Sequence, residues 1–257
     1  MILSIVDKNI EQTKKTVEKA ERLKKSIMQN LLTGKIKPDG TKRREEDFYF
    51  DEKFGKVPIG WEICKLKKYG KFSNGLNFSK DQVGEGKLFV NLSDIFSNQV
   101  IDCSKLERLN SKVSQKVILE KNDLVFVRSS VKLEGIGLPS LFPGYSEEVT
   151  FCGFIIRYNY DKNRIFPKYI INLLRFQHYR NKTISLGQVL ANTNISQSSL
   201  GNIRVIIPKN YDEQKRISYF FENIDKRNKE SKKILLRLQK LKKSLMQNLL
   251  TGKIEVN

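Results

Sequence analysis

Histidine and cysteine, which supply many metal ligands and catalytic groups, are scarce in this chain of 257 residues, with one His and three Cys. The single His178 has no second histidine with which to form a ligand set, so we expect it at the surface or at the edge of the core. Cys64, Cys103 and Cys152 are odd in number and far apart, a spacing that fits neither a disulfide framework nor a zinc site. We therefore expect three buried free thiols and no metal.

Long apolar runs are also absent. The opening MILSIVDKNIEQTKK has too short an apolar stretch for a signal peptide, and no window approaches the roughly 20 apolar residues of a membrane span. These absences predict a cytoplasmic protein without a membrane partner.

The motifs of common enzymes are missing as well. The GEGK of residues 84–87 lacks both the spacing and the following hydroxyl of a phosphate-binding loop, and no G-x-S-x-G elbow occurs. An acidic cluster at residues 45–52 has basic neighbours and lacks the spacing of metal ligands, so we interpret it as solvated. We expect neither a catalytic site nor a cofactor.

Apolar and basic residues, by contrast, are abundant. Hydrophobic residues make up 39% and aromatic residues 10%, which is enough for one substantial core and a smaller or elongated part. The formal charge of +20 favours a polyanionic partner such as nucleic acid, the alternative being a lysine-rich solvated surface.

The charge is not concentrated in the middle of the chain. Residues 37–216 hold 30 Lys/Arg against 20 Asp/Glu, residues 1–36 hold 8 against 4, and residues 217–257 hold 10 against 4. Because the ends are more basic per residue, net charge alone does not locate a DNA-binding face, and the terminal lysines equally suit an acidic protein partner or only solubility.

A fourteen-residue segment occurs twice. LKKSIMQNLLTGKI at residues 23–36 returns as LKKSLMQNLLTGKI at residues 241–254, and weaker matches extend the repeat to residues 6–36 and 224–254. In both copies mainly apolar residues recur at heptad a and d positions for about four repeats, which predicts two long amphipathic helices. These positions are Leu3, Val6, Ile10, Thr13, Val17, Ala20, Lys24, Ile27 and Leu31, and Phe221, Ile224, Asn228, Ser231, Leu235, Leu238, Lys242, Leu245 and Leu249.

Two such helices need a partner, because a narrow apolar stripe is not stable alone in water. The simplest arrangement is an antiparallel hairpin, with the intervening residues as a globular head at one end. Gly34 and Gly252 fit the left-handed residue that closes a helix, and Asp212 fits the cap of the second helix. The polar a and d residues, including Lys24 and Lys242, either fix the register of the pair or face solvent.

Between the repeats the pattern is mixed, and we expect an α+β (mixed α/β) head flanked by the two long α-helices. β-branched and aromatic residues predict strands at 61–66, 87–92, 123–128, 149–160 and 203–207, and Pro167 opens a helix over 167–182. The predicted organisation is a first helix at 1–36, a charged linker at 37–54 with the turn signal Pro38-Asp39-Gly40, the head at 55–211 and a second helix at 212–257.

Four segments together resemble one protein family. They are the ending LKKSxMQNLLTGKI of the repeat, PIGWEICKLKKYGKFSNG from residue 58, DLVFVRSS from residue 123, and ISQSSLGNIRVIIPKNYDEQKRISYFFENID from residue 195. They are similar to the specificity subunit of type I restriction-modification systems, over essentially the whole chain. The repeat and the exit motif of Pro208, Glu213, Gln214 and Ile217 are specific, whereas the matches inside the head are loose.

This resemblance implies that the head is a target-recognition domain and that the helices form an antiparallel coiled-coil spacer. It implies a non-catalytic subunit that reads double-stranded DNA and docks methyltransferase subunits through its helices. A restriction subunit then joins the complex through the methyltransferase subunits.

The usual subunit of this family has two recognition domains, whereas this chain has one between two helices. We therefore expect a half-subunit that forms a homodimer, a chain that pairs with a separately encoded recognition half, or a truncated piece. In a two-fold dimer, identical heads read an inverted repeat. A spacer of about 33 helical residues at about 1.5 Å each spans about 50 Å, or near 15 base pairs.

Base contacts in such a head require polar or basic side chains in loops beside strand ends, because Asn and Gln suit adenine and Arg suits guanine. The candidate DNA-binding residues are Asn74, Asn77, Arg128, Lys132, Lys182, Gln188, Asn192 and Asn194. Structural roles stand beside these: Asn74-Gly75 as a turn, Arg128 paired with a carboxylate, and Asn192 or Asn194 as a helix cap near Ser196. The alternative to a DNA reader is a coiled-coil adaptor or assembly protein whose head binds protein.

Overall fold

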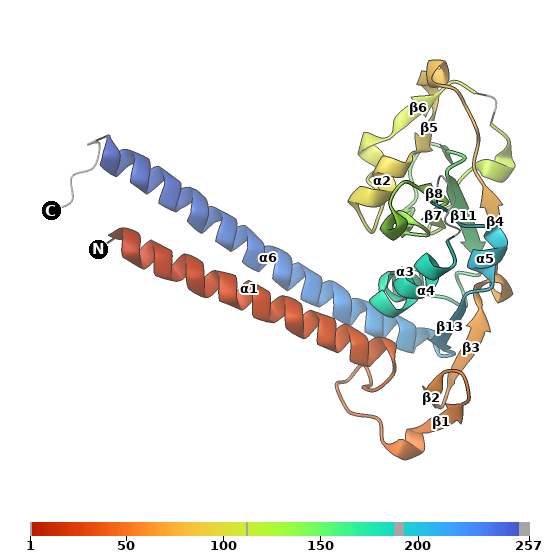
Figure 1. Ribbon diagram of the computed structural model, residues 1–257, viewed down its shortest axis with the longest axis horizontal. Helices are drawn as coiled ribbons and strands as arrows, with labels where there is room; N and C mark the ends of the chain where they lie inside the picture. The colour runs from red at the N-terminus through yellow and green to blue at the C-terminus, as the bar shows by residue number, and fades with distance from the viewer. Residues whose placement is uncertain (1, 112, 188–192, 252–257) are drawn as a thin grey trace. The chain divides into compact units, whose positions relative to one another are not determined.

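The computed structural model describes residues 2–111, 113–187 and 193–251 (Figure 1). The chain divides into two compact units: Met1–Lys42 with Ile217–Asn257, which we call the helical unit, and Arg43–Arg216, which we call the head. The head contains both helices and strands, so the predicted mixed α/β class is confirmed.

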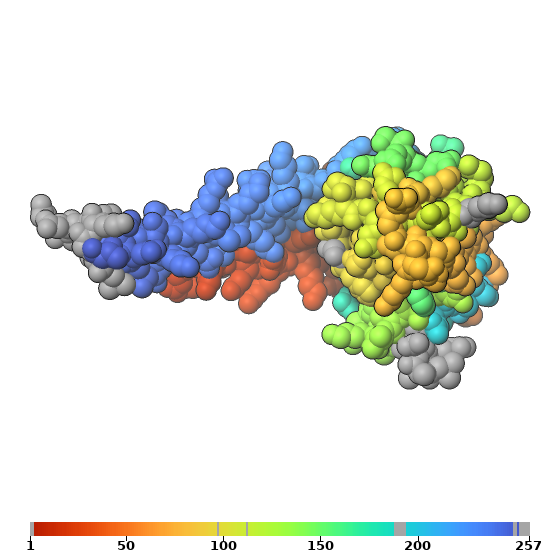
Figure 2. Space-filling model, turned by 90° about the horizontal axis from the view of Figure 1, so that it is seen from above, coloured from red at the N-terminus to blue at the C-terminus, as the bar shows by residue number. Residues whose placement is uncertain are grey.

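The helical unit consists of α1 (Ile2–Leu32) and most of α6 (Tyr211–Leu250), the two helices that the repeat predicts. They lie side by side, α1 in red and α6 in blue (Figures 1 and 2). The predicted a and d residues from Leu3 to Leu31, and from Phe221 to Leu245, are all buried or half-buried, while most positions between them are exposed. The heptad pattern therefore identified the less exposed face of each helix.

The end of α1 also follows the prediction. Gly34 has a left-handed φ of 70°, and the following Lys35 N donates to Asn30 O (2.8 Å), which closes the last turn. Its counterpart Gly252 lies outside the described residues.

Ion pairs connect α1 and α6 in antiparallel register. Lys24 pairs with Asp225, Lys242 Nζ lies 2.5 Å from Asp7 Oδ1, and Lys232 Nζ lies 2.5 Å from Glu21 Oε1. The first two pairs are related by the repeat, because the offset of 218 that carries Asp7 onto Asp225 also carries one lysine onto the other. The helical unit thus has an approximate two-fold symmetry of charge, and the lysines at a and d positions bind carboxylates of the opposite helix.

Two sheets form the centre of the head. An antiparallel sheet has the order β4 (Gly70–Asn74), β11 (Ile155–Tyr160), β7 (Leu124–Val127), β9 (Pro139–Leu141). A second has the order β10 (Val149–Phe151), β5 (Val83–Val90), β6 (Glu107–Leu109), with β10 and β5 parallel. Both contribute to one buried hydrophobic cluster that includes Phe89, Val127, Phe151 and Ile155. On the other face of β11, Tyr158 stacks on Phe72, with ring centroids 4.5 Å apart.

The remaining elements of the head are short. β1 (Phe48–Asp51) pairs with β2 (Gly55–Pro58), β3 (Trp61–Lys65) with β13 (Arg204–Pro208), and β8 (Ser129–Ser130) with β12 (Thr193–Asn194). The helices are α2 (Leu92–Ser97), α3 (Pro167–Arg175), α4 (Gln177–Ser185) and α5 (Gln197–Gly201). Part of the segment predicted as a charged linker is therefore ordered as β1.

Three predicted elements differ from the structure. Residues 149–160 form two strands rather than one, because a turn at 152–154 carries the chain from one sheet to the other. The strand predicted at 87–92 ends at Val90, since Asn91 caps α2 with its side chain (Oδ1 to Leu92 N, 2.8 Å). The helix predicted over 167–182 breaks at Phe176, whose backbone is extended (φ −63°, ψ 137°).

Gln214 of the exit motif is a structural residue of the head. Its side chain is completely buried, and its Oε1 accepts a hydrogen bond from Phe166 N (2.8 Å). Its Nε2 donates to Pro208 O (2.8 Å) and to Arg164 O (3.1 Å). One amide therefore ties the start of α6 to the end of β13 and to the segment before α3.

The neighbouring Glu213 joins the entrance of the head to its exit. Its Oε1 accepts from Arg43 (2.5 Å) and from the indole N–H of the buried Trp61 (3.2 Å). The predicted cap Asp212 was wrong: Asn210 Oδ1 accepts from the N–H groups of residues 212 (2.8 Å) and 213 (3.1 Å) and caps α6 instead. The specific signal of the exit motif therefore marks positions that fold the head.

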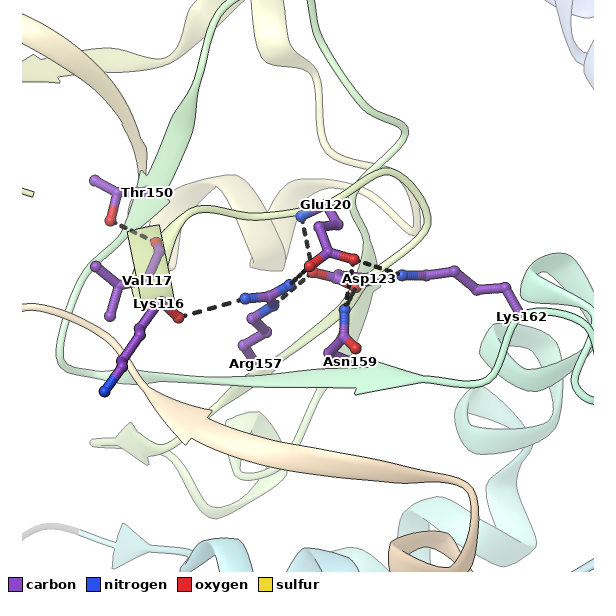
Figure 3. A network of polar contacts seen from close by, with 8 residues as sticks. All are labelled: Lys116, Val117, Glu120, Asp123, Thr150, Arg157, Asn159 and Lys162. Atoms are coloured by element: carbon purple, nitrogen blue, oxygen red, sulfur yellow. Dashed lines mark hydrogen bonds and ion pairs between the residues drawn. The ribbon is translucent and has the colours of Figure 1, made fainter. Parts of the chain in front are cut away.

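A charged network supports the sheet at β11 (Figure 3). Asp123 is completely buried and accepts from Arg157 Nε (2.5 Å), Asn159 Nδ2 (2.9 Å) and Lys162 Nζ (2.9 Å). Glu120 adds a second carboxylate, which accepts from Asn159 Nδ2 at 2.9 Å. Two carboxylates thus face two cations, which compensates the cost of burying the Asp123 charge.

Candidate nucleic-acid interface

Three of the predicted DNA-binding residues line one polar hollow of the head. Asn74 is the last residue of β4, Arg128 follows β7, and Asn194 ends β12, so three distant segments bring them together. The hollow has a volume of about 420 Å³, and its other lining residues are Leu186, Ile195 and residues 196–199. Its wall therefore combines amide, guanidinium and hydroxyl groups, which can both donate and accept hydrogen bonds.

Arg128 is held at both of its backbone groups. Its N–H donates to Phe154 O (2.8 Å), and its carbonyl accepts from Ile195 N (2.9 Å). The guanidinium Nη1 donates to Gly153 O (3.3 Å), which is a backbone carbonyl and not the carboxylate considered from sequence. Because a guanidinium carries five N–H donors, this contact leaves donors for a ligand.

Asn77 is not among the residues that line the hollow and lies against the turn between β10 and β11. A Cβ on Gly153 would lie 2.0 Å from Asn77 Oδ1, and a Cβ on Gly75 would lie 2.3 Å from Cys152 O. Both glycines are therefore needed for close approach of neighbouring segments. The pair Asn74-Gly75 is accordingly not the turn considered from sequence, because β4 runs up to Asn74 and the chain then passes along neighbouring backbone.

Lys182 is not among the residues that line the hollow. Its Nζ lies 4.9 Å from the ring centroid of Phe54 and 5.5 Å from that of Tyr179, and burial lowers its pKa. These distances identify a cation–π contact within the head.

The remaining predicted residues of this region are Gln188, Asn192 and Asn194. Gln188 and Asn192 lie outside the described residues, so their role stays a prediction. Asn194 does not cap α5, because Ser196 Oγ accepts from Ser199 N (2.9 Å) and serves as that cap.

A larger and mostly apolar groove, of about 680 Å³, lies next to the hollow. Its lining includes Phe96 of α2, Val131, the predicted Lys132, and Phe154 of the turn between β10 and β11. Sequence reasoning missed the three apolar residues, because single apolar side chains within polar segments produce no periodic signal.

The cysteines and the single histidine are the remaining groups with possible chemical reactivity. The three cysteines are buried and free, as predicted, and burial raises the pKa of Cys64 to about 12 and that of Cys152 to about 11. Their thiols therefore stay protonated at neutral pH. His178 lies at the surface, as expected, and partial desolvation, followed by the charge of Lys182, lowers its pKa.

The described part of the chain has neither a cluster of potential metal ligands nor a membrane-spanning helix. Over residues 2–111, 113–187 and 193–251, no group of three or more His, Cys, Asp or Glu side chains is placed to hold a metal ion. In those same ranges, no helix is both long enough and apolar enough to cross a membrane.

Comparison with known families gives a match over most of the chain. Residues 58–240 match the family described as the type I restriction modification DNA specificity domain. The matched region includes Asn74, Arg128 and Asn194, and it extends into α6.

Individual relatives agree with this match. The type I restriction enzyme MjaVIII specificity subunit of Methanocaldococcus jannaschii is 26% identical over 271 residues, which cover 99% of this chain and 59% of that protein. This chain thus spans about three fifths of the length of that relative.

Solved structures show a similar fold. The HsdS subunit from Thermoanaerobacter tengcongensis has a TM-score of 0.59 at 14% identity, covering 98% of this chain and 57% of that one. A chain from a structure that describes complex assembly and conformational transition of a type I R-M system has a TM-score of 0.58 at 13% identity, covering 96% and 58%. At such identities the likeness concerns the fold alone.

Proposed function

Because this chain belongs to the family of type I restriction-modification DNA specificity domains, we propose that its head reads one half of a bipartite target in double-stranded DNA. In this proposal the chain is a non-catalytic recognition and scaffold subunit. The observation that carries it is the convergence of Asn74, Arg128 and Asn194 on one hollow from three separate segments.

The side chains of the hollow match the chemistry of base edges. A guanidinium bonds guanine O6 and N7 together, an amide bonds adenine N6 and N7, and each correct pair discriminates by about 1–3 kcal/mol. Lysines and arginines elsewhere on the head would hold phosphates and set the register without reading sequence. The excess of 30 Lys/Arg over 20 Asp/Glu in residues 37–216 supports such contacts.

We propose that α1 and α6 form a coiled-coil spacer that docks methyltransferase subunits, through which a restriction subunit joins. The heptad stripes and the antiparallel ion pairs support this arrangement. Because the helices carry the same motif at residues 23–36 and 241–254, they offer one kind of partner two equivalent surfaces.

The other half of the target requires a second recognition half, which we propose comes from a second copy of this chain or from a separately encoded partner. In a two-fold homodimer the target is an inverted repeat. The 31 residues of α1, at about 1.5 Å each, span about 46 Å, which corresponds to about 14 base pairs.

Selection from a pool of random DNA duplexes tests the proposal, with the full chain alone and together with its methyltransferase subunits. We expect one enriched half-site and binding that weakens steeply as salt rises. Arg128→Ala and Asn74→Ala should each relax the preference at one base pair, whereas Arg204→Ala and Asn110→Ala, at exposed positions outside the hollow, should not. Recovery of no preferred sequence, with salt-insensitive binding, would contradict DNA reading and favour a protein-binding adaptor.

A further inference from the structure

The apolar groove beside the hollow is lined by large hydrophobic side chains that are exposed to solvent. Val131 is 92% exposed, Phe154 is 59% exposed and Phe96 is 47% exposed, although all three line the same groove. Scattered exposed apolar residues are common, but a contiguous patch on a hollowed surface indicates a binding site.

This groove adjoins the candidate DNA-reading hollow along the chain, although the two share no lining residue. Arg128 lines the hollow, and the next residues of the same segment, through Lys132, line the groove. The second link is Phe154, whose side chain lines the groove while its carbonyl accepts from Arg128 N at 2.8 Å. A ligand that fills the hollow is therefore in position to reach the groove.

The occupant of the groove must present an apolar group next to the polar groups that enter the hollow. One cation and one carboxylate, Lys132 and Glu134, line the groove itself, and the guanidinium of Arg128 adds a cation in the neighbouring hollow. On the major-groove edge of DNA, the apolar group among the base edges is the C5-methyl of thymine. A duplex seated with its polar base edges in the hollow presents such methyl groups within a neighbouring base pair.

We propose that the groove reads thymine through its C5-methyl group and that Val131 makes the principal contact. This inference rests on the proposed function and adds a specificity element to it: hydrogen bonds in the hollow select one base pair, and methyl contact in the groove selects an adjacent A·T pair. Removal of one methyl group from the contact should weaken binding about three- to fivefold, the effect expected for one buried CH₂-sized group.

Replacement of thymine by uracil in the selected half-site, one position at a time, tests this without altering any hydrogen bond. We expect the full chain, assembled as for the selection experiment, to bind the thymine duplex about three- to fivefold more tightly than the uracil duplex at one position. Val131→Ser should weaken binding to the thymine duplex and bring both affinities to the same value. Phe154→Ala should reduce the same preference.

A matched control is Ile59→Ser, which changes another exposed β-branched residue of the head (63% exposed) that does not line the groove. It should keep the full preference for thymine. Because Val131 is almost fully exposed, its substitution should leave the thermal unfolding temperature unchanged, and that measurement accompanies the binding assay.

The outcomes separate this inference from the proposed function. Selective binding with equal affinities for thymine and uracil at every position overturns the inference and leaves DNA reading intact. So does a half-site that contains no thymine, or a Val131→Ser variant that keeps the preference. Absence of any selected half-site overturns the proposed function and this inference with it.

Discussion

Gln214 offers the sharpest test of how the head is held together at its exit. Gln214→Leu keeps most of the side-chain volume but removes three hydrogen bonds, to Phe166 N, Pro208 O and Arg164 O. Each intramolecular hydrogen bond contributes about 0.5–1.5 kcal/mol, and each buried polar group left without its partner costs about 1–3 kcal/mol. We therefore expect a loss of about 3–5 kcal/mol in the free energy of unfolding. A domain with a total stability of about 5–15 kcal/mol would lose a large fraction of it.

Equilibrium unfolding in urea measures this loss, and the single tryptophan is a convenient probe. Trp61 is 2% exposed and donates to Glu213, the residue before Gln214, so its fluorescence reports on this part of the head. The control is Gln239→Leu, the same substitution at an exposed position of the same helix, which should change stability by less than about 0.5 kcal/mol. A loss below about 1 kcal/mol for Gln214→Leu, with the same slope of unfolding free energy against urea concentration, would refute the reasoning.

Gln214→Glu separates hydrogen bonding from packing. The carboxylate keeps an acceptor for Phe166 N but turns an acceptor toward two carbonyls, so at neutral pH it should destabilise the head at least as strongly as leucine. Its protonation at low pH restores one donor, and the deficit relative to the parent protein should shrink there.

Three further predictions concern charge. Asp123→Ala removes the buried carboxylate of the network and leaves Arg157 and Lys162 only the exposed carboxylate of Glu120, so it should cost about 3–5 kcal/mol in urea unfolding. A loss below about 1 kcal/mol would show that solvent already screens the network. Burial raises the pKa of Glu120, but the hydrogen bonds and cations of the network outweigh it and hold that pKa below its usual 4.5. The stabilisation from Glu120 is therefore present above pH 4.5 and lost as the pH falls through the lowered value, so Glu120→Gln should destabilise at neutral pH and match the parent in acid; a pH-independent difference would contradict this. Lys242→Glu should destabilise the helical unit by about 0.2–1 kcal/mol, and adding Asp7→Lys should recover most of it, as a double-mutant cycle on thermal unfolding would measure; no coupling energy would exclude the ion pair.

The long helices were predictable because their signal is local. Heptad spacing and a helix-closing Gly34 depend on residues near one another in the chain, and the structure has α1 and the less exposed face where the pattern places them. The predicted ends of some elements were wrong because nearby asparagine side chains cap helices there. Asn91 turns a predicted strand into a helix start, and Asn210 caps α6 two residues before the expected Asp212.

The candidate site was only partly predictable. Asn74, Arg128 and Asn194 were predicted from residue type and from their position beside strands, and the fold brings them to one hollow. Lys182 met the same criteria, but its ammonium group lies over the rings of Phe54 and Tyr179 instead. This contact depends on how α4 packs in the head, which the sequence does not show. The apolar groove gave no sequence signal at all, since Phe96, Val131 and Phe154 come from three unrelated segments.

The sequence by itself determined that two equivalent amphipathic helices flank a mixed head, and it supplied the residues by which the family is identified. Such information is carried by periodicity, repetition and short motifs, which are properties of neighbouring residues. Only the tertiary structure decided which polar side chains share a hollow and that an apolar groove adjoins it. Those contacts join β4, the segment after β7 and the turn between β10 and β11, and they depend on strand order and on the close backbone approach that Gly75 and Gly153 permit.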